Sequence, residues 1–235
     1  MKIIQPYAKI MVLTPEPLRH IEWCARISHR SEDASPNTER FIKTVVMDHG
    51  DWSVVEHVTA SVDAVMDRGI THEWVRHRLA SYTQESTRFV NYEKKMPPAF
   101  IYPIPGVDCE YCRTGDEPTV SGIHHRPGFP LCQYNRDWLW IIQNCENMYC
   151  ALLKKGWRPQ EARSVFPNAL ASRIVTTANL RSWRHFFLMR TSKEAHPQMR
   201  QITIPLLKEF QQRIPLLYDD IVPESRQIDN LKLGR

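Results

Sequence analysis

The chain has 235 residues and a formal net charge of +5, and its hydrophobic and charged fractions of 42% and 24% are typical of a folded, soluble protein. The basic residues are dispersed, whereas a nucleic-acid-binding stripe would concentrate them. No apolar run approaches the ~20 residues needed to span a bilayer. We therefore expect no nucleic-acid or membrane partner, and small phosphorylated ligands instead.

The N-terminus and the cysteines indicate the compartment. Residues 1–6 lack the apolar segment of a signal peptide. Six cysteines in a chain without an export signal are more typical of thiols or metal ligands than of disulfides. We expect a cytoplasmic protein.

Hydrophobic periodicity and helix-end signals predict mainly helices with few strands. A helix is expected from Pro15 to His29, and a second opens at Ser35-Pro36-Asn37 and stops at His49-Gly50. Alternating β-formers predict a strand over residues 56–65. Later helices are expected over residues 70–75, 134–155, 159–167, 180–189 and 195–213, with an extended segment over 171–178.

This order of elements predicts the fold class. Helices with few strands, in no βαβ rhythm, indicate an α+β fold and not a doubly wound sheet. Neither a GxGxxG nor a Walker loop is present, so neither common nucleotide-binding fold is indicated. We expect a single domain over residues 1–235, interrupted by an irregular Pro/Gly-rich insertion at about 103–130.

Residues 76–88 carry three arginines, a histidine, several hydroxyls and an amide. Arginine forks bind phosphate and carboxylate oxygens two at a time. If Arg76 and Arg78 were both helical they would diverge by roughly 200°, so one short element would address two anionic groups. The alternative is a solvated basic face at a helix end, where arginine also suits the helix dipole.

The spacing within this stretch resembles that of a known enzyme family. The flavin-dependent thymidylate synthases carry the pattern RHRxxSxxxxSxR, and its fixed positions are met by Arg76, His77, Arg78, Ser81, Ser86 and Arg88. The resemblance extends from about Leu13 to Phe210, except for the insertion. It implies a central, mostly antiparallel sheet flanked by helices, and a homotetramer whose active sites draw on more than one subunit.

The resemblance also implies which residues bind the nucleotide dUMP. Residues 162–167 resemble an Ala-Arg-x-x-Leu-Pro segment whose arginine contacts the nucleotide, and Arg190 takes the position of the arginine that activates the uracil ring. Arg190 is therefore the expected catalytic residue. The substrate-binding set implied in this way is Glu73, Arg76, Gln84, Ser86, Thr87, Arg88, Arg163 and Arg190.

A second set is implied for FAD. Residues 49–57 resemble the segment that reaches the flavin, with Glu56 and His57 as the family has them, and residues 179–190 resemble an Asn-x-Arg-Ser segment. Arg181 and His185 are spaced i, i+4, so they share a helix face. The cofactor-binding set is Ser53, Arg76, His77, Arg78, Gln84, Asn179, Arg181 and His185.

Three positions depart from the family pattern. Asp51 and His185 stand where some members carry a histidine and an asparagine, and Gln84 stands where a glutamate is usual, with Glu85 one residue on. Glutamine can accept a hydrogen bond but cannot act as a base, so a positional role is expected at 84. Ser86 has no identifiable base beside it and is assigned to binding.

The insertion poses a separate question. Cys109 and Cys112 have C-x₂-C spacing and are followed by His124, His125 and Cys132. These residues could complete a structural zinc site, remain free thiols, or form a redox pair. The family requires no metal, and none is assigned.

Taken with the family, the sequence predicts methylation of dUMP to dTMP. Methylenetetrahydrofolate would supply the carbon, and FAD reduced by NADPH would supply the hydride. Two alternatives are a mildly basic RNA- or DNA-binding module and a relative that keeps the fold without turnover.

Overall fold

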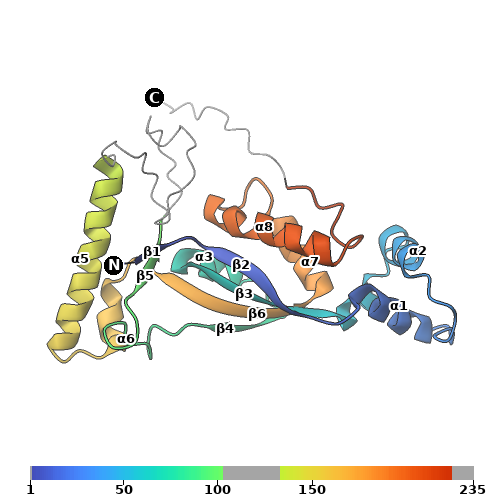
Figure 1. Ribbon diagram of the computed structural model, residues 1–235, viewed down its shortest axis with the longest axis horizontal. Coiled ribbons are helices and arrows are strands. Elements are labelled where there is room, and N and C mark those ends of the chain that lie inside the picture. The colour runs from blue at the N-terminus through green and yellow to red at the C-terminus, as the bar shows by residue number, and fades with distance from the viewer. Residues whose placement is uncertain (1, 103–132, 224–235) are drawn as a thin grey trace. The chain divides into compact units, whose positions relative to one another are not determined.

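The computed structural model describes residues 2–102 and 133–223 (Figure 1). The expected insertion at 103–130, together with Cys132, falls outside these residues, so the zinc question is not addressed by the structure. Among the described residues, no helix has both the length and the apolar character that a membrane crossing needs.

The chain divides into two compact units. The first comprises residues 1–7, 64–76 and 82–175, and the second comprises residues 8–63, 77–81 and 176–235. The expected single domain stays a prediction, and each unit is described by itself below.

The larger sheet has the strand order β2-β3-β6-β4 and is mostly antiparallel. Along β6 the burial alternates: Ser172, Ile174 and Thr176 are buried, whereas Arg173 is exposed, as a strand with one face covered requires. The predicted α+β fold, with a mostly antiparallel sheet flanked by helices, is confirmed. The strands are β2 (Tyr7–Leu13), β3 (Thr59–Asp67), β4 (Ala80–Gln84) and β6 (Ala171–Asn179).

The first unit contains a short parallel strand pair and several helices. β1 (Lys2–Ile4) pairs with β5 (Ala99–Ile101), with Ile3 opposite Phe100. α3 (Arg68–Trp74) begins at Asp67, whose side chain accepts from the amide of Ile70 at 2.8 Å and caps the helix. The remaining helices are α5 (Gln133–Lys154), α6 (Pro159–Ala162) and the 3₁₀ turn η3 (Arg163–Val165).

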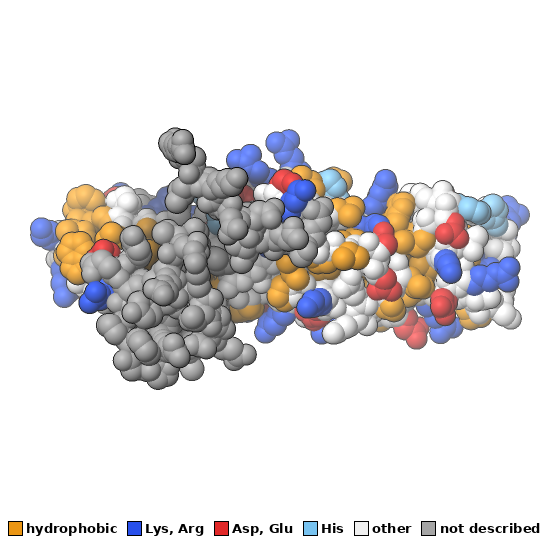
Figure 2. All heavy atoms as spheres, turned by 90° about the horizontal axis from the view of Figure 1, so that it is seen from above, with side chains coloured by type: hydrophobic (Ala, Val, Ile, Leu, Met, Phe, Trp, Pro, Cys, Tyr) orange, Lys and Arg blue, Asp and Glu red, His pale blue; other side chains and the backbone are white. Residues whose placement is uncertain are grey.

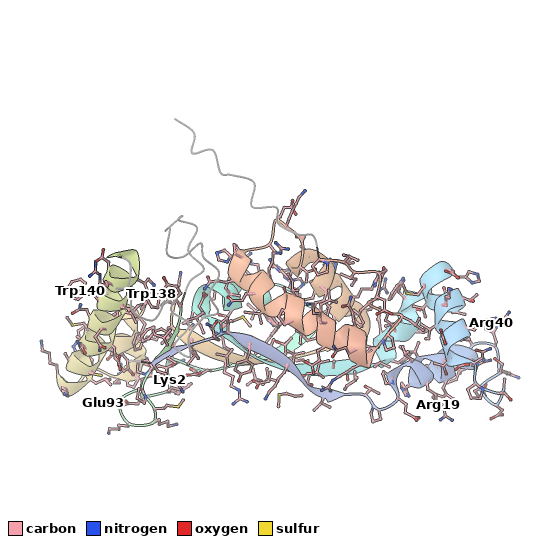
Figure 3. The ribbon with its side chains drawn as sticks, turned by 45° about the horizontal axis from the view of Figure 1, so that its top comes forward. Lys2, Arg19, Arg40, Glu93, Trp138 and Trp140 are labelled. Carbon is pink, nitrogen blue, oxygen red and sulfur yellow. The ribbon has the colours of Figure 1, made fainter. Side chains whose placement is uncertain are left out.

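α5 contributes several side chains to the apolar core of the first unit. Ile142 and Tyr149 are buried, and Tyr149 stacks on Phe166 at 4.5 Å between ring centroids. Trp138 and Trp140 both lie on α5 (Figure 3). Trp138 packs against the core, whereas Trp140 is 69% exposed, since residues two apart on a helix point in nearly opposite directions.

The second unit is largely helical. Its helices are α1 (Pro17–Ile27), α2 (Thr38–Phe41), the π-helical turn η1 (Ile42–Asp48), the 3₁₀ turn η2 (Trp52–His57), α7 (Leu180–Arg190) and α8 (Pro197–Arg213). Trp183 of α7 donates its ring N–H to the Ala60 carbonyl of β3 at 3.0 Å. Phe187 and Phe210 pack against the Trp183 ring, and Tyr218 packs against both of these phenylalanines. Large buried rings with a satisfied N–H provide much of the packing energy of such a unit.

Two local expectations are wrong. The predicted strand over 56–65 begins only at Thr59, because Glu56 and His57 belong to η2, where buried Val55 and Val58 stand three residues apart, as a 3₁₀ turn favours. The helical geometry considered for residues 76–78 also fails.

The helix before this motif stops at Trp74, and its last turn is closed by bonds from the Val75 and Arg76 amides. β4 then starts at Ala80, in a Ser-Tyr-Thr run that suits a strand. The two motif arginines therefore do not diverge by helical rotation, and the division of units falls between Arg76 and His77.

Candidate active site

Two arginines of the first unit are joined by one neutral residue. Gln160 lies in α6, and its backbone carbonyl accepts from Nε of Arg163 at 3.2 Å. Its side-chain Oε1 accepts from Nε of Arg88, also at 3.2 Å. Within the described residues, neither guanidinium forms an ion pair with a carboxylate. Both positive charges therefore remain uncompensated, which suits an external anion.

A turn carries Arg88 into this arrangement. Thr87 is 4% exposed, and its hydroxyl accepts from Nη1 of Arg163 at 2.9 Å. The hydroxyl of Ser86 accepts from the Arg88 amide at 3.3 Å, and the Ser86 carbonyl accepts from the Val90 amide at 3.0 Å. Four residues of the predicted nucleotide set, from segments distant in sequence, are thereby brought together.

Gln84 is held by two hydroxyl groups. Its amide nitrogen donates to Oγ1 of Thr71 at 3.1 Å and to Oγ of Ser172 at 2.9 Å. The Thr71 hydroxyl donates its only hydrogen to the Arg68 carbonyl at 2.8 Å, so toward residue 84 it can only accept. An amide fits this position because its nitrogen donates to Thr71. An ionised carboxylate would place an oxygen that can only accept opposite the accepting hydroxyl of Thr71.

The adjacent carboxylate has a different use. Glu85 accepts from the Tyr92 hydroxyl at 2.7 Å. Burial, followed by this hydrogen bond, raises the pKa of Tyr92 above its usual range. Glu85 is thus engaged inside the first unit, while the side-chain oxygen of Gln84 has no partner within the described residues. Position 84 offers a ligand a neutral acceptor.

In the second unit, Arg190 is held by His77. Arg190 is the last residue of α7, and its Nε donates to Nε2 of His77 at 3.0 Å. The Arg190 carbonyl accepts from the Thr203 hydroxyl of α8 at 2.8 Å, which fixes the backbone from which the side chain extends. This bond joins two residues 113 positions apart that the sequence had assigned separately.

The surroundings of His77 keep its imidazole neutral. The ring lies edge-on to Phe186 at 4.8 Å and faces His185 at 5.9 Å. Burial first, then the charges of Arg190 and His185, lower the pKa of His77 to about 4. Near neutral pH its Nε2 therefore accepts from Arg190, and the ring proton belongs on Nδ1.

Two residues predicted to contact FAD have partners within the protein. Asn179 caps α7, because its side-chain oxygen accepts from the Ser182 amide at 2.8 Å. Nη1 of Arg181 lies 2.7 Å from Oε1 of Glu56, in a pair whose side chains are 53% and 46% exposed. Such an exposed pair is open to solvent, and a ligand anion can compete for the guanidinium.

The remaining predicted residues are more open. Ser53, Arg78 and His185 are exposed in the second unit, and Arg76 is exposed in the first. Within the described residues, the guanidinium groups of Arg76 and Arg78 have no hydrogen-bonding or ionic partner. The half-buried Glu73 completes the set at the end of α3.

The structure therefore gathers the predicted residues into two groups. Glu73, Arg76, Gln84, Ser86, Thr87, Arg88 and Arg163 belong to the first unit, whereas Ser53, His77, Arg78, Asn179, Arg181, His185 and Arg190 belong to the second. The first group is mainly the expected nucleotide set, and the second is mainly the expected FAD set with the catalytic arginine.

The sequence reasoning missed Gln160. One signal was available, because Gln160 and Arg163 are three residues apart and Pro159 marks a helix start, which places the two on one face. No local signal connected either residue to Arg88, which lies 72 positions from Gln160.

On the face in Figure 2, Lys and Arg side chains lie interspersed with acidic and hydrophobic ones. The fold and the two groups of residues define an α+β protein equipped to bind anionic ligands. Residues 9–216 match the family described as thymidylate synthase complementing protein, and the chain belongs to this family. The resemblance drawn from the 76–88 motif is confirmed, as is the expectation of an enzyme.

Several relatives carry the name flavin-dependent thymidylate synthase. One from Corynebacterium efficiens is 33% identical over 183 residues, covering 77% of this chain and 68% of the relative. One from Pyrococcus furiosus is 29% identical over 219 residues, covering 89% and 79%. One from Corynebacterium aurimucosum is 31% identical over 207 residues, covering 85% and 78%.

Proposed function

We propose that this protein catalyses the reductive methylation of dUMP to dTMP, with FAD as cofactor. The name shared by its relatives supports a flavin and thymidylate formation. The observation in this chain that carries the proposal is the pair formed by Arg88 and Arg163, held by neutral groups. A 5′-phosphate supplies the two negative charges and several acceptor oxygens that such a pair favours.

Arg88 and Arg163 would hold that phosphate, helped by the Ser86–Thr87 turn and by Arg76. With Nε of Arg88 engaged by Gln160, its two terminal nitrogens are the donors left for phosphate oxygens. Arg163 uses Nε and one hydrogen of Nη1 inside the protein, so Nη2 and the second hydrogen of Nη1 are the donors left for a ligand. Gln84 would offer its oxygen to an N–H of the nucleotide or the cofactor.

Arg190 would act on the uracil ring. For C5 to attack a carbon donor, negative charge must build up on the ring oxygens, and a fixed guanidinium stabilises that charge without transferring a proton. His77 would fix the orientation of the Arg190 side chain through Nε. Because the imidazole is neutral, it orients the cation without compensating its charge.

FAD would bind to the second group of residues. The exposed guanidinium of Arg78 and the exposed ring of His185 fit a ligand with phosphates and an aromatic system, and Arg181 would join them by exchanging Glu56 for a ligand anion. FAD bound there would supply the hydride once reduced by NADPH, and methylenetetrahydrofolate would supply the carbon. Ser53, His77 and Asn179 would complete the surroundings of the cofactor.

We also propose a cytoplasmic homotetramer in which each active site draws on more than one subunit. Large apolar side chains on α5 support an association surface, since Trp140, Ile141 and Met148 are each more than half exposed. Light scattering of the purified protein measures the mass directly, and a monomer at working concentration would contradict the proposal.

One experiment tests the function itself. The purified protein should show the absorption of oxidised flavin, and it should form dTMP only when dUMP, methylenetetrahydrofolate and NADPH are all present. Each of the three is omitted in turn, and dTMP formed without one of them would show that this compound is not required. Salt-dependent oligonucleotide binding by a colourless protein would favour the nucleic-acid alternative instead.

A further inference from the structure

We propose that Gln160 is a positioning residue that makes Arg88 and Arg163 specific for a phosphate monoester dianion. The inference rests on the proposed function, because it assumes that these arginines receive the phosphate of the substrate. It adds a residue that lies outside the motif, and it assigns that residue a definite electrostatic role.

Gln160 holds the two cations from two different groups of its own. The backbone carbonyl takes Nε of Arg163, and the side-chain oxygen takes Nε of Arg88, each at 3.2 Å. Two like charges bonded to one residue repel each other, and a carboxylate at this position would attract both of them. Gln160 provides the acceptor oxygens of such a bridge without a negative charge.

The neighbouring carboxylate is directed elsewhere. Glu161 accepts from the Arg158 amide at 2.9 Å and from Nε of Arg158 at 2.8 Å. Hydrogen bonds from Arg158, the largest cause, and from the Gln160 side chain lower the pKa of Glu161. Glu161 is thus bonded to Arg158, and the side-chain acceptor for Arg88 is the neutral amide oxygen of Gln160.

The plane of Arg88 has a second constraint. Its guanidinium lies 5.3 Å from the ring centroid of Phe89, which is 75% exposed. A guanidinium stacked on a ring and bonded through Nε is left with its two terminal nitrogens as a fork. Such a fork matches two oxygens of one phosphate, so the pair is preorganised for a dianion and has little to offer an uncharged nucleoside.

The sharpest test compares Gln160→Glu with Gln160→Ala. Gln160→Glu keeps the shape and places a carboxylate between the arginines, so that an internal ion pair competes with the ligand. We expect its Kd for dUMP to rise about tenfold or more, equivalent to at least ~1.4 kcal/mol, with a smaller rise in Gln160→Ala. The Kd for deoxyuridine, which lacks the phosphate, should stay unchanged in both.

Gln212→Glu provides the matched control. Gln212 is exposed in α8, so the same substitution adds the same charge away from the arginines and should leave the Kd for dUMP unaltered. Calorimetric titrations with dUMP, deoxyuridine and inorganic phosphate are made on FAD-loaded protein, and a thermal melt of each variant reports whether it is folded. The conservative variant Gln160→Asn should bind dUMP more weakly than the parent does, because its side chain is one carbon shorter and its oxygen does not reach Arg88.

The outcomes separate the inference from the function it rests on. Equal losses for dUMP and deoxyuridine in folded Gln160→Glu, or no loss for dUMP, would overturn the role of Gln160. If Gln160→Glu does not fold, Gln160→Ala tests the role of Gln160 instead, by the change in Kd for dUMP compared with the change in Kd for deoxyuridine. If the parent binds inorganic phosphate but forms no dTMP, the proposed function fails while the phosphate titrations still test Gln160.

Discussion

Arg88 and Arg163 of the first unit are held by a different kind of partner from Arg184 of the second unit. In the first unit, Arg88 and Arg163 contact an amide oxygen, a carbonyl and a hydroxyl. In the second, Arg184 forms a two-point ion pair with Asp220 and donates to the Leu217 carbonyl at 2.6 Å. A carboxylate partner compensates the charge of an arginine, whereas neutral acceptors orient the side chain and leave its charge for a ligand.

We infer that the partner of an arginine, more than its position in a motif, indicates its role. Arg184 also lies over the Trp52 ring at 4.6 Å, and its bonds to Asp220 lower the pKa of that carboxylate. These contacts tie α7 to η2 and to the segment after α8, so Arg184 stabilises the unit. Arg190, on the same helix, donates to the neutral imidazole of His77.

The largest expected effect is on Arg190. Arg190→Ala should keep FAD but lose turnover by ~10²–10³, as loss of one donor to a developing oxyanion typically does. The measurement is kcat in a flavin-loaded variant, with the flavin content read from its absorption. A near-normal kcat would show that Arg190 does not have the proposed catalytic role.

The next effect separates the two anionic ligands. Arg88→Ala should weaken dUMP binding more than FAD binding, and Arg78→Ala should do the reverse, because each loses a charge-assisted contact of roughly 1.5–3 kcal/mol with a different ligand. Paired titrations of flavin and dUMP measure both. Equal effects of each variant on both ligands would show that the arginines do not serve separate anions.

Arg184→Ala is the contrasting variant for this comparison. It should lower the free energy of unfolding while the Kd for dUMP changes little, since its partners are Asp220 and Leu217 and not a ligand. Breaking a partly buried ion pair and a cation–π contact should cost about 1–3 kcal/mol. Denaturant unfolding measures it, and a selective loss of dUMP affinity would contradict the structural role.

A smaller effect follows from His77. Its pKa in the folded protein is lowered to about 4 from 6.5, so between these values the unfolded chain binds more protons than the folded one. The stability contributed by the neutral ring is complete above pH 6.5 and is lost as the pH falls toward 4. Since the ring is only half-buried, we expect a loss of about 1–2 kcal/mol.

Unfolding measured from pH 7 to pH 4 tests this expectation. His77→Gln, which keeps an acceptor but does not titrate, should show a shallower decline with acid than the parent does. Parallel declines in the two proteins would assign the acid sensitivity to other groups.

The smallest effect concerns the amide at position 84. Gln84→Glu should lower the free energy of unfolding by about 1 kcal/mol, because a carboxylate opposes the accepting hydroxyl of Thr71. Thr71→Val in the same protein removes that acceptor, so the double variant should lose less than the sum of the single ones. Strict additivity would show that the hydroxyl does not select the amide.

The sequence by itself determined much of this protein. α1, α5, α7 and α8 could be placed because helix periodicity and end signals such as Gly156 lie within a few residues of each other. The family could be identified because its motif has fixed spacing over residues 76–88. β1, β2, β4 and β5 were not predicted; β1, β4 and β5 have only three to five residues, and such short runs carry little periodic signal.

Only the tertiary structure decided which polar groups meet. Gln160 and Arg88 lie 72 positions apart, and His77 and Arg190 lie 113 apart, so no local pattern relates the members of either pair. The same holds for Gln84, whose amide is selected by a hydroxyl of α3 and one of β6. Backbone preferences act over a few residues, whereas the partner of a side chain depends on which distant segments the packed core brings beside it.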